Sequence, residues 1–91
     1  MKLQLPASLR ESGQSGLLDV GVPALGTLRA VLDELEGRYP TVKNRLLDER
    51  GDIPGYVTFY VNGEDVRHGD GLNTVLSERD EVVILPAISG G

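Results

Sequence analysis

Apolar residues follow two different periods along the chain. Leu3 and Leu5 alternate with polar residues, and a second alternating segment covers 17–22. A period of two is typical of half-buried strands, and the polar, glycine-bearing segment 12–16 between them predicts a turn, hence an antiparallel hairpin. The period then changes, because the next apolar residues are spaced i, i+3, i+4 and i+7, as on one buried face of a helix. These residues are Leu28, Val31, Leu32 and Leu35.

Polar and breaker residues set the limits of this helix. Thr27 precedes it and can cap its first turn by accepting a backbone N–H. Gly37 and Pro40 predict its end. A shorter helical stretch is expected over 42–47, and the charged segment 48–55, rich in Gly and Pro, is expected to be a surface loop.

The second half of the chain predicts another hairpin. Residues 57–62 alternate, and Asn62-Gly63 is a strong hairpin signal because both residues tolerate positive φ. A brief strand is expected over 64–67, followed by a turn at 68–71. One short helical turn should follow, with Leu72, Val75 and Leu76 as its apolar side.

The last strand, 81–85, is apolar on both of its sides. Val82 and Ile84 fall on one side, and Val83 and Leu85 on the other. Such a strand is usually central in its sheet and covered on both faces. The expected fold is therefore an α+β roll: a mixed sheet of about five strands with one main helix packed on it, in which a long strand after the helix crossover can lie parallel to the first.

Composition and charge are those of one small folded domain. The chain has 91 residues, of which 25% are charged, and a formal net charge of −5. This acidic balance argues against nucleic acid as a partner. The absence of cysteine excludes disulfides, thiolate metal sites and a cysteine nucleophile. No apolar run is long enough to span a membrane, and residues 1–10 lack a signal-peptide core, so a cytoplasmic monomer is expected.

Side-chain chemistry is sparse. The motifs of ATP-binding P-loops, zinc proteases, serine hydrolases and dinucleotide-binding folds are all missing. The one histidine, His68, could form at most a weak metal site with Asp65 and Asp70, and a solvated loop is the favoured interpretation. The aromatic side chains are expected to pack within strands rather than to bind a ligand; these are Tyr56, Phe59 and Tyr60.

The unusual feature is the diglycine Gly90-Gly91, which follows the apolar last strand through a short tail. The domain is expected to occupy 1–85 and a flexible tail 86–91, which when extended reaches about 20 Å. Because glycine has no Cβ, such a tail can enter a narrow channel. The Gly91 carboxylate is ionised at neutral pH and is a poor electrophile, so it needs activation by another protein.

The segments 60–67 and 80–91 carry a resemblance that extends over essentially the whole chain. They are similar to the MoaD/ThiS family of ubiquitin-like sulfur carriers, which have a β-grasp fold, and most closely to the carriers of bacterial cysteine biosynthesis. The resemblance to the small subunit of molybdopterin synthase is weaker. That subunit typically has an aromatic pair and two prolines where this chain has Ile84-Leu85 and Pro86-Ala87.

The resemblance implies a mechanism in which this chain binds no cofactor and is a protein cosubstrate, not an enzyme. An E1-like adenylyltransferase would use ATP and magnesium to adenylate Gly91, while Gly90 keeps the tail thin. A sulfur donor would replace AMP to leave a thiocarboxylate. The acceptor enzyme would be cysteine-synthase-like or, failing that, the large subunit of molybdopterin synthase.

Ordering the tail in a partner costs roughly 1–2 kcal/mol per residue, so the folded body should supply much of the docking energy. The candidate partner-binding residues are Val83, Leu85, Pro86, Ala87, Ile88 and Ser89. Ordinary packing of Val83 and Leu85 under a loop is the alternative. Two other functions also stay open: a ubiquitin-like modifier joined to lysines through Gly91, and a plain interaction domain whose diglycine is incidental.

Overall fold

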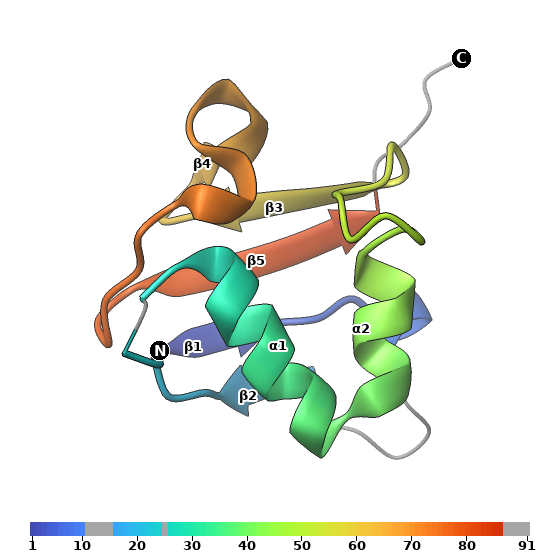
Figure 1. The fold of residues 1–91 in the computed structure, drawn as a ribbon, viewed down its shortest axis with the longest axis horizontal. Coiled ribbons are helices and arrows are strands. Elements are labelled where there is room, and N and C mark those ends of the chain that lie inside the picture. The colour runs from blue at the N-terminus through green and yellow to red at the C-terminus, as the bar shows by residue number, and fades with distance from the viewer. Residues whose placement is uncertain (11–15, 25, 87–91) are drawn as a thin grey trace.

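The computed structural model describes residues 1–10, 16–24 and 26–86. Its centre is a five-stranded mixed sheet with the strand order β2-β1-β5-β3-β4 (Figure 1). The last strand is central, as predicted, and it pairs parallel with β1 and antiparallel with β3. The strands are β1 (Lys2–Gln4), β2 (Leu17–Asp19), β3 (Val57–Val61), β4 (Glu64–Asp65) and β5 (Glu81–Pro86).

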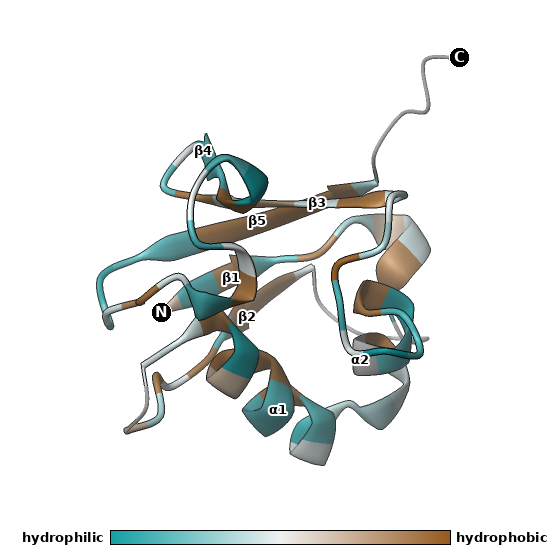
Figure 2. Ribbon diagram, turned by 45° about the horizontal axis from the view of Figure 1, so that its top comes forward, coloured by the Kyte–Doolittle hydropathy of each residue, from teal (hydrophilic) through white to brown (hydrophobic). Residues whose placement is uncertain are grey.

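Two helices, α1 (Leu28–Arg38) and α2 (Pro40–Leu46), cover one face of the sheet (Figure 1). All four predicted apolar residues of α1 are fully buried, as is Phe59 of β3 opposite them. In Figure 2 the ribbon is brown along much of β5 and on stretches of α1, as expected for elements that contribute residues to this core. Helix α1 continues through Gly37, and Pro40 begins α2, because proline is well suited to the first position of a helix. No helix of the described residues is long and apolar enough to cross a membrane.

The first hairpin forms as expected, but its second strand is shorter than predicted. β1 and β2 pair antiparallel, with Leu3 opposite Leu18. The strand ends at Asp19 instead of Val22, because the Val22 N–H donates to the Glu78 carboxylate (2.9 Å) and so leaves the ladder. The predicted turn at 12–16 lies outside the described residues, apart from Gly16.

The second hairpin turns at Asn62-Gly63, as predicted. Both residues have positive φ, 51° and 89°, the backbone that a two-residue hairpin turn of this type requires. The expected strand 64–67 is wrong in its second half, because β4 ends at Asp65. The Asp65 carboxylate accepts the Arg67 N–H (2.9 Å) and so caps a 3₁₀ turn, Val66–His68.

The predicted helical turn carrying Leu72, Val75 and Leu76 is only partly correct. A 3₁₀ turn covers Gly71–Asn73 and buries Leu72, and Leu76 is buried as well. Val75, however, is extended, forms an isolated β-bridge with Thr27, and has a side chain that is 75% exposed. The apolar spacing of so short a run does not distinguish a helical turn from an extended bridge.

The Thr27 cap allows a test of this local structure. Its hydroxyl oxygen accepts the Ala30 N–H (3.2 Å), which would otherwise lack a partner at the helix start. We expect Thr27→Ala to lower the free energy of unfolding by about 1 kcal/mol. Thr27→Ser keeps the hydroxyl and should lose much less. Urea denaturation followed by circular dichroism measures both, and equal losses in the two variants would contradict a role for the hydroxyl.

Candidate functional site

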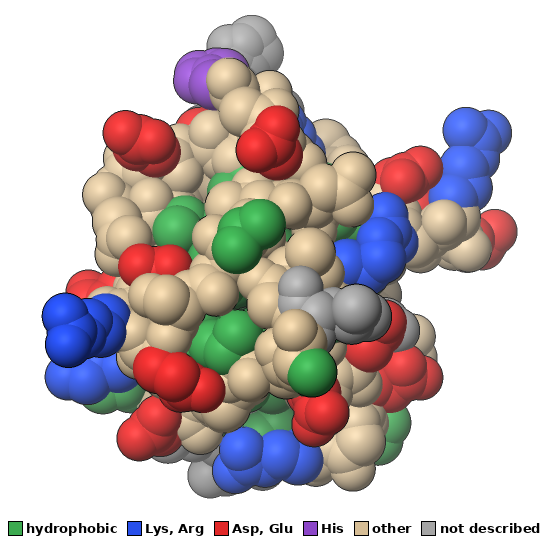
Figure 3. All heavy atoms as spheres, turned by 60° about the vertical axis from the view of Figure 1, so that its left-hand side comes forward, with side chains coloured by type: hydrophobic (Ala, Val, Ile, Leu, Met, Phe, Trp, Pro, Cys, Tyr) green, Lys and Arg blue, Asp and Glu red, His purple; other side chains and the backbone are tan. Residues whose placement is uncertain are grey.

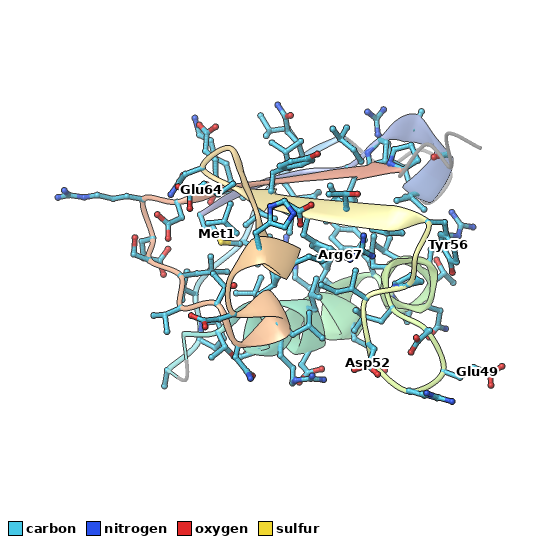
Figure 4. All side chains as sticks on the ribbon, turned by 90° about the horizontal axis from the view of Figure 1, so that it is seen from above. Met1, Glu49, Asp52, Tyr56, Glu64 and Arg67 are labelled. Carbon is cyan, nitrogen blue, oxygen red and sulfur yellow. The ribbon has the colours of Figure 1, made fainter. Side chains whose placement is uncertain are left out.

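The two sides of β5 lie in different environments. Val82 and Ile84 are fully buried against the helices, whereas Val83 is half-buried and Leu85 is 45% exposed on the other face. The expectation that this strand is covered on both faces is therefore wrong for the part of the chain that the structure describes. The sheet is seen edge-on in Figure 4, with both helices on one side of it. The second apolar side of β5 is thus available for contact.

Neighbouring strands extend this exposed side. In the register of the sheet, Val83 lies between Gln4 of β1 and Tyr60 of β3, and Gln4 lies opposite Leu17 of β2. Leu17 is 51% exposed. We call Leu17, Val83 and Leu85 the open-face patch. Large exposed apolar side chains that share one sheet face are typical of protein interaction sites.

A shallow groove runs beside the open-face patch, between β1 and the end of β5. All three patch residues line it, together with Arg10. The Arg10 Nε donates to the Leu5 carbonyl (3.0 Å), which holds the guanidinium near β5. A cation at this position gives the patch a positive rim in an otherwise acidic protein.

The last described residue, Pro86, lies next to the patch. β5 extends to Pro86, one residue beyond the predicted strand end, and Pro86 lies opposite Val57 at the start of β3. Pro86 is exposed, and Leu85 directly precedes it. The other predicted tail residues lie outside the described residues; these are Ala87, Ile88, Ser89, Gly90 and Gly91. A partner that binds the patch therefore contacts the strand from which the tail departs.

One aromatic residue at this end was missed by the sequence pattern. Phe59 is buried and Tyr60 half-buried, which agrees with strand packing, but Tyr56 is 57% exposed and directly precedes β3. Its position before the strand, next to Gly55, could have predicted this exposure. A residue outside the strand need not follow the alternation of inward and outward side chains. Exposed Leu17 was missed because Leu17 and Leu18 are both apolar, so the pattern does not show which of the two side chains faces the core.

No metal centre is found. Among residues 1–10, 16–24 and 26–86, no group of three or more Asp, Glu, His or Cys side chains is placed to hold an ion. Asp65 instead caps the 3₁₀ turn that contains His68, through the backbone N–H of Arg67.

Comparison with known proteins places the chain in a family. The model of the ThiS family matches residues 3–91. The sulfur carrier protein CysO of Mycobacterium tuberculosis is 45% identical over 67 residues, which are 71% of this chain and 72% of that protein. A small archaeal modifier protein, number 3 of Haloferax volcanii, is 35% identical over 65 residues, 71% of this chain and 70% of that protein.

Solved structures agree with the sequence comparison. The crystal structure of M. tuberculosis CysO superimposes with a TM-score of 0.85 at 36% identity, covering 96% of this chain and 98% of that one. CysO in the Amycolatopsis orientalis BexX/CysO complex gives a TM-score of 0.84 at 31% identity, covering 99% and 98%. These matches confirm the β-grasp fold expected from the sequence. With its β-grasp sheet, its exposed central strand and a family match over nearly its whole length, the chain belongs to the ThiS family.

Proposed function

We propose that the chain is a sulfur carrier protein, a cosubstrate of other enzymes and not a catalyst. The observation that carries the proposal is the Gly90-Gly91 pair, which follows a central strand with an exposed apolar side after three intervening residues. Relatives named as sulfur carriers support it.

The chemistry takes place at the Gly91 carboxyl carbon. A carboxylate oxygen attacks the α-phosphorus of ATP on an E1-like adenylyltransferase and releases pyrophosphate, with magnesium balancing the phosphate charge. The resulting acyl adenylate is an electrophile. Sulfide sulfur then attacks the carbonyl carbon and the C–O bond to AMP breaks, which leaves a C-terminal thiocarboxylate and AMP.

The thiocarboxylate sulfur then passes to a biosynthetic acceptor on a second enzyme. We favour a cysteine-synthase-like enzyme over the large subunit of molybdopterin synthase. The 45% identity to a protein named CysO supports this choice. So does the segment Ile84-Leu85-Pro86-Ala87, which lacks the aromatic pair and the second proline typical of the molybdopterin carrier.

The fold explains why the body of the protein is needed. Ordering the five residues beyond Pro86 costs about 5–10 kcal/mol in backbone entropy. The open-face patch can offset part of this cost, since burial of a leucine-sized side chain contributes about 1.5–3 kcal/mol. Val83 and Leu85 of the patch lie on the strand that precedes residues 87–91, so one partner can bind the patch and those residues at once.

Intact mass spectrometry tests the proposal. The purified chain is incubated with a candidate E1-like enzyme, MgATP and sulfide. We expect a mass increase equal to the replacement of one oxygen by sulfur, and no increase when ATP is omitted. If no E1-like enzyme of the source organism produces this increase, the carrier function is wrong.

A second candidate function is a ubiquitin-like modifier, favoured by the 35% identity to a small archaeal modifier protein. A modifier forms an isopeptide between Gly91 and a lysine of another protein, with loss of AMP from the same adenylate. The two functions are separated by the product: since the last tryptic site is Arg79, a modifier leaves residues 80–91 attached to lysines of other proteins after tryptic digestion, whereas a carrier gives only the thiocarboxylate.

A further inference from the structure

A second concave surface lies away from the open-face patch. The β3–β4 hairpin and the segment 66–75 enclose a depression of about 800 Å³. It is near the hairpin turn at Asn62-Gly63, whereas the tail leaves the sheet beside Val57 at the other end of β3. The two ends are separated by four residues of strand, about 13 Å. We call this depression the hairpin groove.

The hairpin groove is strongly acidic. Among the residues that the structure describes, four carboxylates line it and no Lys or Arg does; they are Glu64, Asp65, Asp70 and Asp80. Figure 3 shows acidic side chains around exposed apolar atoms on the side of the molecule that carries this hairpin. Arg67, next to the groove, donates to the Pro54 carbonyl, and Figure 4 shows it well away from Glu64.

Two of these carboxylates are fixed in place. Asp65 caps the 3₁₀ turn, as described above. Asp80 accepts the Asn62 side-chain amide (2.9 Å) and the Ser77 N–H (2.8 Å), and these hydrogen bonds hold its pKa below the usual range. Asp80 therefore stays ionised well below neutral pH, and the groove presents a fixed negative field.

An apolar residue lies among these charges. Val75 lines the groove and has the most exposed large apolar side chain of the described residues. The bonds around its bridge to Thr27 run from the Leu28 N–H to the Thr74 carbonyl and from the Leu76 N–H to the Gly26 carbonyl. The Val75 N–H and carbonyl thus point away from that pairing, and neither has a partner among residues 1–10, 16–24 and 26–86.

We propose that the hairpin groove docks an extended basic segment of a partner protein. An aliphatic side chain of that segment packs on Val75, its backbone pairs with the free Val75 N–H and carbonyl, and flanking Lys or Arg residues meet the carboxylates. Charge complementarity selects such a segment, because the acidic rim repels acidic peptides and nucleic acid. Its distance from the tail allows this partner to bind while an activating enzyme holds the open-face patch.

A defined peptide tests the proposal. The ¹⁵N-labelled chain is titrated with the capped hexapeptide Arg-Lys-Leu-Leu-Lys-Arg, and chemical shifts are followed by NMR. We expect the shifts to concentrate in 62–75. Val75→Asp is decisive: the added negative charge would strengthen purely electrostatic binding, so a threefold or greater loss of affinity requires an apolar contact. Unchanged or tighter binding by this variant overturns the proposal.

Charge variants provide the matched control. Glu64→Lys with Asp70→Lys changes the net charge as much as Glu34→Lys with Glu49→Lys, and all four side chains are exposed. We expect at least a tenfold loss of peptide affinity in the first pair and less than twofold in the second. Equal losses mean diffuse attraction and contradict a groove. Deletion of Gly90 and Gly91 should leave peptide binding unchanged, so this test is independent of sulfur transfer.

Discussion

Deletion of Gly90 and Gly91 will abolish sulfur loading while leaving the domain folded. The deletion removes Gly91 and leaves the terminal carboxylate on Ser89, two residues short of the position that must reach another protein's active site. No side chain of the body can restore that reach, because the reacting atom is in the backbone. We expect no detectable thiocarboxylate by intact mass spectrometry under conditions that load the full chain completely.

Stability provides the control for this deletion. Neither deleted residue belongs to a described strand or helix, the last of which ends at Pro86, so we expect the free energy of unfolding to change by less than about 0.5 kcal/mol. Gly90→Ala keeps the carboxylate but adds a Cβ to the tail. This variant should slow loading without preventing it. Comparison of the two variants separates the effect of a shorter tail from the effect of a thicker one. Sulfur uptake by the deletion variant would show that the sulfur is carried elsewhere.

Leu85→Asp will lower kcat/KM for adenylation at least tenfold, equivalent to about 1.4 kcal/mol of lost transition-state binding. Leu85 is 45% exposed on the open face and precedes the tail, so a partner that holds the tail buries it. An aspartate there has to be desolvated in an apolar interface, or the interface stays open. Pyrophosphate release at several carrier concentrations measures the effect.

The control for Leu85→Asp adds the same charge elsewhere. Asn44 is exposed on α2, on the helical side of the sheet, so Asn44→Asp should leave adenylation unchanged. Both variants should unfold cooperatively, since neither side chain belongs to the buried core. If Leu85→Asp is folded and adenylated at the normal rate, the open-face patch is not the docking surface.

The elements that were predicted correctly from the sequence are those in which a single physical factor fixes the conformation. The four apolar residues of α1 share one face and the Thr27 hydroxyl caps it, so helix and orientation follow together. Asn62-Gly63 is likewise fixed by the positive φ that its turn demands. The central position of β5 followed from the apolar character of both of its sides.

Prediction failed where a short segment had two physically similar solutions. Val75 fitted a helical turn by spacing, but a β-bridge to Thr27 was formed instead, which depends on a residue far away in the sequence. The second apolar side of β5 was compatible with burial under another segment of this chain and equally with contact to a partner protein. Only the three-dimensional structure shows that, among the described residues, Leu85 stays exposed on that side.

The order of the strands has a consequence during synthesis. β5 is the last strand to be made, yet it is the one that joins β1 to β3, which share no other partner. The two halves of the sheet therefore unite only after residue 86 has emerged from the ribosome. A nascent chain that ends before β5 has an incomplete sheet and lacks both Val83 and Leu85. A chain that lacks β5 would therefore also lack the surface on which the proposed activating enzyme docks.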